Sequence, residues 1–530
     1  MAKCALAIGG TGARCLEALV HLCAIGMGPE ELFVLVLDPD ESNGNIGILR
    51  DVITKYQDCR ERLGSGATIF KTKIEYCTEK LSWSPAKPRE RLIDCFDYPT
   101  LKARPQEKIL ADICDLLYTN SELKLEMDKG FWGHATIGAP IMARLKKEFK
   151  EANEAHSHAN NSVGNPWRMM RNKIEEDLHG GVGGAHLFLF GSIFGATGAS
   201  GLPAAGKILR DVLGKEVHIG GAFLLPYFGF AKQESRNVSD VISLSEDFFH
   251  KTKIALQYYS DIWGLESQGS PFDNVYLIGE TELGMRQGDE QRPYAGGGPE
   301  QNNYAHYIEL MAALAAIDSF HTERNFNAEQ GSKIIRECTI ARNANSVIEW
   351  SDLPESGLRE RLVIFTTLAF AFRNFYHPLI MKEYINRSLR LFPWYVDHFD
   401  RKEIFDPNKM NAVNGYFKDF LEWLYRIHHS AQVDLRLLNR NILRKSREST
   451  ENGEPYKSLA DYEFKDLLSD TKGACSHGYD ILWQELCGLE KIKIEPYSCE
   501  GKLLYLLYLA SQRFCNQNYQ FVQNTTGGQT

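Results

Sequence analysis

Short apolar runs alternate with longer amphipathic stretches through the first 230 residues. The runs at 4–8, 33–37, 187–190 and 218–225 are bounded by glycines or polar turn residues, which is typical of strands buried on both faces. Amphipathic helices follow several of them, as parallel strands require, because their crossovers need a helix. The pattern predicts an α/β fold with a doubly wound parallel sheet, to which 272–279 adds a last strand.

The pattern changes after this last strand. Residues 302–317 predict a long central helix, and beyond Phe320 the chain has longer helical periods with many aromatic residues. The apolar run 362–372 is shorter than the ~20 residues that span a bilayer, so it predicts a buried helix. We therefore expect a sheet domain over 1–300, a connecting helix over 301–322, a largely helical second domain over 323–515 and a flexible tail over 516–530.

Two predicted strands run into glycines and small hydroxyl residues and then into a helix. The first loop is Gly9-Gly-Thr-Gly12, and the second follows Phe194 with Gly-Ala-Thr-Gly-Ala-Ser-Gly201. Backbone N–H groups in such loops can surround an anion, and the positive end of the helix adds attraction. Large side chains would keep the backbone away from a phosphate. One such loop is weak evidence, but the pair predicts a phosphate site.

The second loop resembles the signature loop of the tubulin/FtsZ superfamily, whose usual core is Gly-Gly-Gly-Thr-Gly-Ser/Thr-Gly. Thr197, Gly198 and Pro203 are in register with it, whereas Ala196 and Ser200 replace two glycines. The resemblance implies a tubulin/FtsZ-like nucleotide-binding domain with GTP or GDP and Mg²⁺ as ligands. It also implies self-association into filaments or closed oligomers, with further protein partners for the second domain.

The resemblance further implies that successive strand ends form the nucleotide site. Asp38 would lie in an acidic second loop near the metal, and 130–138 would be a third loop before a helix over 139–150. Asn303 would recognise guanine, although an Asn at a helix start is also a preferred N-cap. The residues assigned to the nucleotide are Gly9, Gly10, Thr11, Gly12, Arg14, Asp38, Gly133, Gly195, Ala196, Thr197, Gly198, Ala199, Pro226, Glu234 and Asn303.

Hydrolysis has weaker support in the sequence. Polymerising members of the superfamily complete it with acidic residues of the adjacent subunit, from a loop just after the central helix. The stretch 321–329 has a similar place but lacks the usual Asp pair. Glu323 and Glu329 are the candidates for orienting water, and polarity at a helix end explains them equally well. A nucleotide-binding scaffold that does not hydrolyse is therefore an alternative function.

An NAD(P)-dependent oxidoreductase is a further alternative. The first glycine loop would then hold a pyrophosphate, and Asp38 or Asp40 would bind a ribose hydroxyl. Tyr98 and Lys102 match the Tyr-x-x-x-Lys pair of short-chain dehydrogenases, but we expect Pro99 to interrupt the helix that such a pair needs. This interpretation leaves the second glycine loop unexplained.

Composition narrows the class of protein. The 530 residues are 43% hydrophobic and 24% charged, which is typical of a globular protein with ample core. A net charge of −9 argues against general nucleic-acid binding. The 12 cysteines include no Cys-x-x-Cys pair, so we expect reduced thiols and no protein-built metal site. The start of the sequence has no signal-peptide pattern, and we expect a cytoplasmic protein without a membrane span.

Overall fold

The structure is a computed structural model that describes sixteen segments of the chain. They are residues 3–63, 68–77, 80–154, 165–179, 184–229, 247–263, 270–280, 298–301, 303–322, 334–340, 353, 357–386, 392–400, 402–429, 479–490 and 498–518. The candidate residues Glu234, Glu323 and Glu329 lie outside these segments, as does most of the predicted tail.

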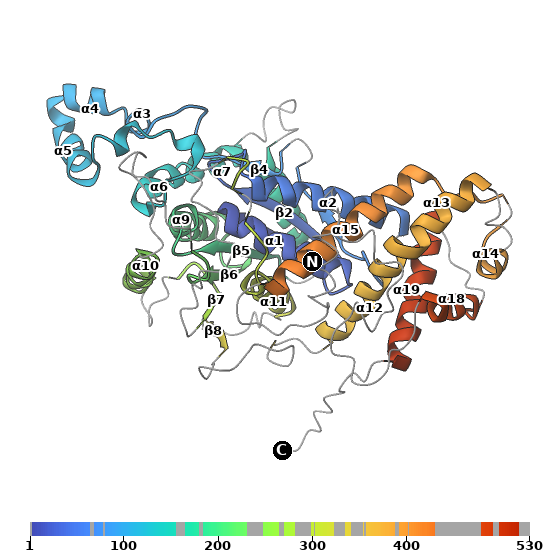
Figure 1. The fold of residues 1–530 in the computed structure, drawn as a ribbon. Helices are drawn as coiled ribbons and strands as arrows, with labels where there is room; N and C mark the ends of the chain where they lie inside the picture. The colour runs from blue at the N-terminus through green and yellow to red at the C-terminus, as the bar shows by residue number, and fades with distance from the viewer. Residues whose placement is uncertain are drawn as a thin grey trace, which may run out of the picture.

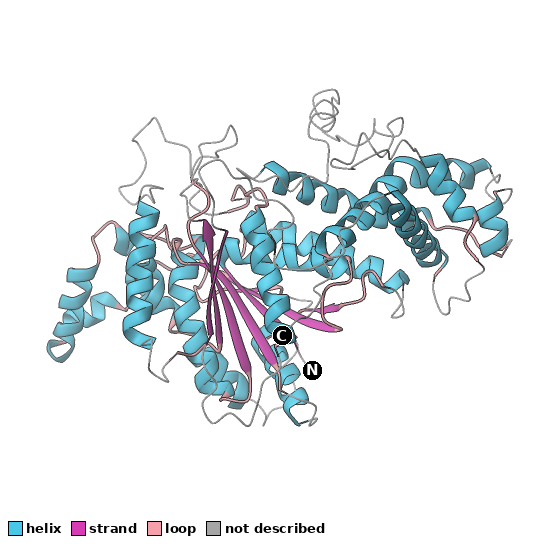
Figure 2. Ribbon diagram, turned by 90° about the horizontal axis from the view of Figure 1, so that it is seen from below, coloured by secondary structure: helices cyan, strands magenta, loops and turns pink. Residues whose placement is uncertain are grey.

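A single parallel sheet is the centre of the fold (Figure 2). Within the described segments it has eight strands in the order β3-β2-β1-β5-β6-β7-β8, with β4 also beside β2, and every neighbouring pair is parallel. The strands are β1 (Lys3–Ile8), β2 (Glu31–Leu37), β3 (Lys73–Glu75), β4 (Ser82–Trp83), β5 (His186–Ser192), β6 (His218–Leu224), β7 (Asn274–Glu280) and β8 (Ile334–Ile340). The predicted α/β class with a parallel sheet is confirmed.

Helices cover both faces of this sheet and contain most of the described residues beyond 357 (Figure 1). Up to residue 321 the α-helices are α1 (Gly9–Ala24), α2 (Gly44–Leu63), α3 (Leu92–Cys95), α4 (Tyr98–Ala103), α5 (Lys108–Leu117), α6 (Ala135–Met142), α7 (Leu145–Glu154), α8 (Pro166–His179), α9 (Ala196–Leu213), α10 (Phe248–Trp263) and α11 (Tyr307–His321). The later ones are α12 (Leu358–Ala371), α13 (His377–Asn386), α14 (Pro393–His398), α15 (Pro407–His429), α18 (Tyr479–Cys487) and α19 (Cys499–Asn518). In the described part of the chain, no helix is both long enough and apolar enough to span a membrane.

The strand order reverses between β1 and β5. From β1 the chain moves outward through β2 to the edge strands β3 and β4, and it then returns to β5 on the other side of β1. Leu6 of β1 therefore lies between Leu35 of β2 and Leu189 of β5. In doubly wound sheets a ligand crevice opens at such a point, beyond the carboxyl ends of the two strands.

Alternating side chains of the strands supply two separate cores. Ala5 and Ala7 of β1 face the layer of α1, α2 and α11, whereas Cys4 and Leu6 face the layer that contains α6 to α10. Because both layers are apolar, each strand is buried on both sides, as its continuous apolar sequence predicts. Helix α11 lies deepest, with 13 of its 15 residues buried.

The helices from α12 to α19, here called the helical half, belong to one of these two cores and have no separate core of their own among the described residues. Helices α15 and α19 pack on α2, and α12 packs on both α15 and α19. Phe70 contacts the rings of Tyr56 on α2, Phe365 on α12 and Tyr416 on α15 at centroid distances of 4.9–5.6 Å. His21 of α1 also lies against Tyr416, and burial lowers the pKa of His21 to about 3. Aromatic residues of the helical half thus pack it against α1, α2 and Phe70 on one side of the sheet.

Several element bounds differ from the sequence prediction. Helices α1 and α9 begin at Gly9 and Ala196, so much of each predicted glycine loop is the first turn of a helix. The helix expected over 139–150 is two helices, α6 and α7, and the first begins four residues early, at Ala135. Strand β8 follows the central helix in sequence, yet it extends the first sheet beside β7.

The shared core predicts that Phe70→Ala destabilises the sheet layer and the helical half together. Removing this fully buried ring leaves a cavity at their junction, which should cost about 3–5 kcal/mol of unfolding free energy. Urea unfolding followed by circular dichroism measures the loss. Val396→Ala, at a 57% exposed position, is the control and should change stability by less than about 0.5 kcal/mol. Two separate unfolding transitions, of which the substitution shifts only one to lower urea concentration, would contradict a shared core.

Candidate functional site

A pocket opens at the strand-order reversal, beyond the carboxyl ends of β1, β2 and β5. Its empty volume is ≈ 810 Å³, open solvent at the mouth included. Eleven of the residues predicted to bind a nucleotide line it. They are Gly9, Gly10, Thr11, Arg14, Asp38, Gly133, Gly195, Ala196, Thr197, Gly198 and Asn303.

Two helices point their N-termini into this pocket. The N-cap residues of α1 and α9 are Ile8 and Gly195, whose side chains cannot accept a hydrogen bond. The first backbone N–H groups of a helix have no acceptor within that helix, so both first turns present donors to the pocket. The two helix dipoles add partial positive charge at the same place. This arrangement is suited to an anion such as a phosphate chain.

Close backbone approach explains the glycines of these two turns. Gly9 has φ +75°, and a Cβ there would lie 3.1 Å from Cβ of Thr197, so the two turns touch each other. A Cβ on Gly198 would lie 2.2 Å from the carbonyl oxygen of Ser192, and one on Gly12 would lie 2.8 Å from that of Phe190. Glycine lets each helix begin directly against a strand, and this packing brings the two N-termini together.

The turn after β2 forms an acidic wall. Asp38 and Asp40 are almost fully buried, and Oδ1 of Asp38 accepts a hydrogen bond of 3.0 Å from the backbone N–H of Asp40. Burial raises the pKa of Asp38 to about 8, and the neighbouring charge of Asp40 adds to the rise. Asp38 is therefore protonated more readily than an ordinary carboxyl group, and a bound cation would favour its ionised form.

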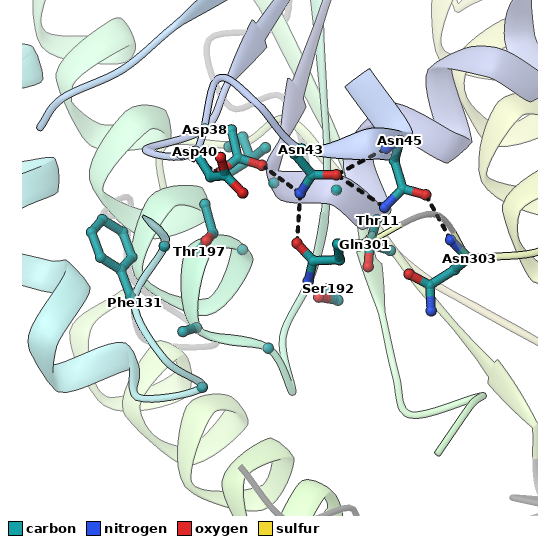
Figure 3. A pocket seen from close by; sticks show the side chains of 18 of the residues that line it. Thr11, Asp38, Asp40, Asn43, Asn45, Phe131, Ser192, Thr197, Gln301 and Asn303 are labelled. Carbon is teal, nitrogen blue, oxygen red and sulfur yellow. Dashed lines mark hydrogen bonds between the residues drawn. The ribbon is translucent and has the colours of Figure 1, made fainter. Parts of the chain in front are cut away.

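Asparagine side chains link the turn after β2 to the segment before α11 by hydrogen bonds (Figure 3). Oδ1 of Asn43 caps α2 by accepting from the backbone N–H of Asn45 at 3.0 Å. The amide of Asn43 donates to Oε1 of Gln301 at 2.7 Å, and Oδ1 of Asn45 accepts from the backbone N–H of Asn303 at 3.0 Å. The backbone N–H of Gly298 donates to Asp40 at 2.6 Å. Gly298, Gln301 and Asn303 are thus held at the pocket by polar side chains of the turn after β2 and of the start of α2.

These contacts separate the two interpretations of Asn303. The N-cap of α11 is His306, which accepts from the N–H of Ile308, while Glu309 accepts from the N–H of His306. The prediction that Asn303 caps the helix is therefore wrong. Asn303 lines the pocket three residues earlier, and Figure 3 shows it at the far end of the view from Thr197.

Arg14 ties α1 to the central helix at the pocket floor. Its Nε donates to Glu309 of α11 at 2.5 Å, and its Nη2 donates to the hydroxyl of Tyr227 at 2.8 Å. Tyr227 in turn donates to the same Glu309 oxygen at 2.6 Å. Burial alone would lower the pKa of Arg14, but Glu309 and Tyr227 outweigh it and raise the pKa. The guanidinium therefore stays charged beside the two helix ends and is paired with Glu309.

Residues 129–133 form another wall of the pocket. Gly130, Trp132 and Gly133 all have positive φ, and Lys251 of α10 donates to the carbonyl oxygen of Gly133 at 3.0 Å. Phe131 is buried beneath this turn and would collide with a Cβ on Gly138 of α6. The predicted third loop is therefore a tight turn fixed from two helices.

Three of the predicted nucleotide residues do not line the pocket in the described part of the chain. Gly12 packs against β5, Ala199 accepts a hydrogen bond from Tyr259, and Pro226 precedes the two aromatic residues that lie near Arg14. Asn43, Asn45 and Gln301 also line the pocket and were not predicted from the sequence. Their polarity predicts only turns, because their role depends on contacts between residues about 258 positions apart.

The dehydrogenase-like pair has the expected local geometry but the wrong place. Tyr98 and Lys102 do lie on one helix, α4, because Pro99 occupies its first turn, where proline is tolerated. The expectation that Pro99 interrupts the helix is therefore wrong. Both side chains contact Asp115 of α5, and neither lines the pocket. The pair thus forms a local contact of the α3–α5 region.

Comparisons of the sequence with models of known protein families and with curated proteins find no match.

The pocket residues fit a nucleotide with its metal. Two uncapped helix ends suit the phosphates, and the carboxamide of Asn303 offers the donor and acceptor that a base edge needs. Among the described residues, no group of three or more His, Cys, Asp and Glu side chains forms a metal cage. Mg²⁺ commonly binds through one or two carboxylates together with phosphates, and Asp38 and Asp40 would hold it in that way. Bound there, the ion would neutralise phosphate charge.

The raised pKa of Asp38 predicts a pH-dependent effect of Asp38→Asn. The folded protein retains the Asp38 proton up to about pH 8, whereas the unfolded chain loses it near pH 4. The stability that the protonated form provides is complete below pH 4 and is lost as the pH rises to 8. Because Asn cannot ionise, we expect the variant to gain unfolding free energy relative to wild type across this interval. Urea titrations without Mg²⁺ measure it. Exposed Asp51→Asn is the control, and a pH-independent difference for Asp38→Asn would contradict the prediction.

Proposed function

We propose that this chain is a divergent tubulin/FtsZ-like protein of the cytoplasm that binds GTP or GDP with Mg²⁺ and self-assembles. The observation that supports the proposal most is the pairing of two uncapped, glycine-rich helix starts at one strand-order reversal. The phosphates would bind there. The base would extend toward Asn303, on the segment that leads into the buried helix α11.

Chain order adds support for the superfamily assignment. Glycine-rich turns follow β1 and β5, an acidic turn follows β2, and a proline-aromatic turn follows β6. All four turns contribute to the lining of the pocket, through Gly9, Asp38, Thr197 and Phe228 respectively along the chain order β1, β2, β5 and β6. An NAD(P)-dependent oxidoreductase would explain only the turns after β1 and β2. Its candidate Tyr98–Lys102 pair lies outside the pocket.

Ligand binding tests the assignment of the two ends of the pocket. Thr197→Val removes a hydroxyl beside the proposed phosphates, and we expect it to weaken GTP and ATP equally, by about tenfold. Asn303→Ala should weaken GTP by a similar factor and leave ATP unchanged, because only the base contact is lost. Titration calorimetry with Mg²⁺ measures both, with Thr54→Val on an exposed position as the control.

Two outcomes of this titration would overturn the proposal. Binding of NAD in place of GTP would assign the pocket to a dinucleotide. Equal loss of GTP and ATP in Asn303→Ala would remove the proposed base contact and leave the nucleotide preference to other residues.

Hydrolysis would be completed at a contact between subunits, with Glu323 and Glu329 as the proposed water-orienting carboxylates. We therefore expect GTP turnover per subunit to rise with protein concentration and GTP to increase sedimentation. The double variant Glu323→Ala/Glu329→Ala should lose turnover and keep GTP affinity. GTP binding without turnover at any concentration would instead support the non-hydrolysing scaffold.

A further inference from the structure

Helix α5 has its small residues inside and its large aliphatic residues outside. Its inward face consists of Ala111 and Cys114, both buried. The outward residues are between 45% and 83% exposed, and they are Ile109, Leu110, Ile113, Leu116 and Leu117. A surface helix normally buries its large apolar residues. We call these five residues the α5 stripe.

The α5 stripe is continuous and uncharged. At 100° per residue its members lie within about 120° of one another, on the side opposite Ala111. The acidic residue Asp115 points away from it, toward Tyr98 and Lys102 of α4. The five side chains present on the order of 500 Å² of apolar surface, which is the size of patch that marks an interaction site.

The spacing of the stripe is the same in both directions. The intervals between its members are one, three, three and one residues, so the pattern is symmetric about Ile113. A two-fold axis through Ile113 would pair Ile109 with Leu117, and Leu110 with Leu116, of an antiparallel copy. The N-terminal Lys108 of each helix would then lie near the negative C-terminal end of the other. A two-fold contact of this kind requires a self-complementary surface, and this stripe provides one.

We propose that the α5 stripe is a homodimer contact, occupied by the α5 stripe of a second copy of this chain. Two stripes together bury on the order of 1,000 Å², about the smallest area of a specific interface, so the dimer should form at micromolar concentrations. Helices α3, α4 and α5 form a lobe at the edge of the molecule, far from the helical half (Figure 1). Two lobes can therefore meet without a clash between the bodies. The contact needs no nucleotide and is independent of the proposed GTP site.

Sedimentation velocity in nucleotide-free buffer, across about 1–100 μM, tests this contact. The wild-type chain should be dimeric at the upper concentrations. Leu116→Lys places a charge in the stripe and should weaken dimerisation at least tenfold. Ile404→Lys, at a similarly exposed isoleucine of the helical half, is the control and should stay dimeric. Because position 116 is 83% exposed, the variant should keep its circular dichroism spectrum.

Two further variants test the antiparallel geometry. Leu110→Glu added to Leu116→Lys should restore dimers, since each new Glu would face a new Lys across the axis. Ile113→Cys lies on the axis and should form a disulfide-linked dimer on mild oxidation, which wild type should not. A monomeric wild type, or a Leu116→Lys variant that dimerises like wild type, would overturn the proposal. Loss of GTP binding alone would leave it intact.

Discussion

The site depends on the close approach of two helix starts at the ends of two adjacent strands. Helix α1 begins directly after β1, and three residues separate the end of β5 from the start of α9. Gly9 reaches Thr197, and Gly12 and Gly198 let the helices pass the backbone of β5. Because both helices point their N-termini at the same crevice, their partial charges and N–H groups would act together on an anion bound there. A side chain at Gly198 would separate these helix starts.

The buried pair of Arg14 and Glu309 joins this crevice to the centre of the molecule. Breaking a buried ion pair costs several kcal/mol, because the remaining charge stays desolvated. The pair fixes α1 against α11, and Glu309 also satisfies the N–H of His306 at the start of α11. The same carboxylate thus sets the position of the helix that follows Asn303. The shape of the pocket and the packing of α11 therefore depend on the same few atoms.

Helix α1 also connects the pocket with the helical half. Its first turn lines the pocket, and about three turns later His21 packs against Tyr416 of α15. On the other side, Arg426 of α15 lies over the ring of Tyr304, the residue after Asn303. The helical half therefore contacts α1 and the residue next to Asn303, and it shares the core that α1 and α11 form against the sheet.

The parallel α/β sheet, the strand ends and the two glycine-rich turns could all be predicted from the amino-acid sequence. These features are local, because apolar runs, glycines and helix periodicity report the burial and backbone freedom of each segment. Tertiary structure alone decided that β8 joins the first sheet and that α5 exposes its aliphatic face. It also decided that Asn43, Asn45 and Gln301 hold Asn303 beside the pocket, and that Tyr98 and Lys102 lie away from it. Each of these outcomes depends on which distant segments pack together, and residue type does not specify that partner.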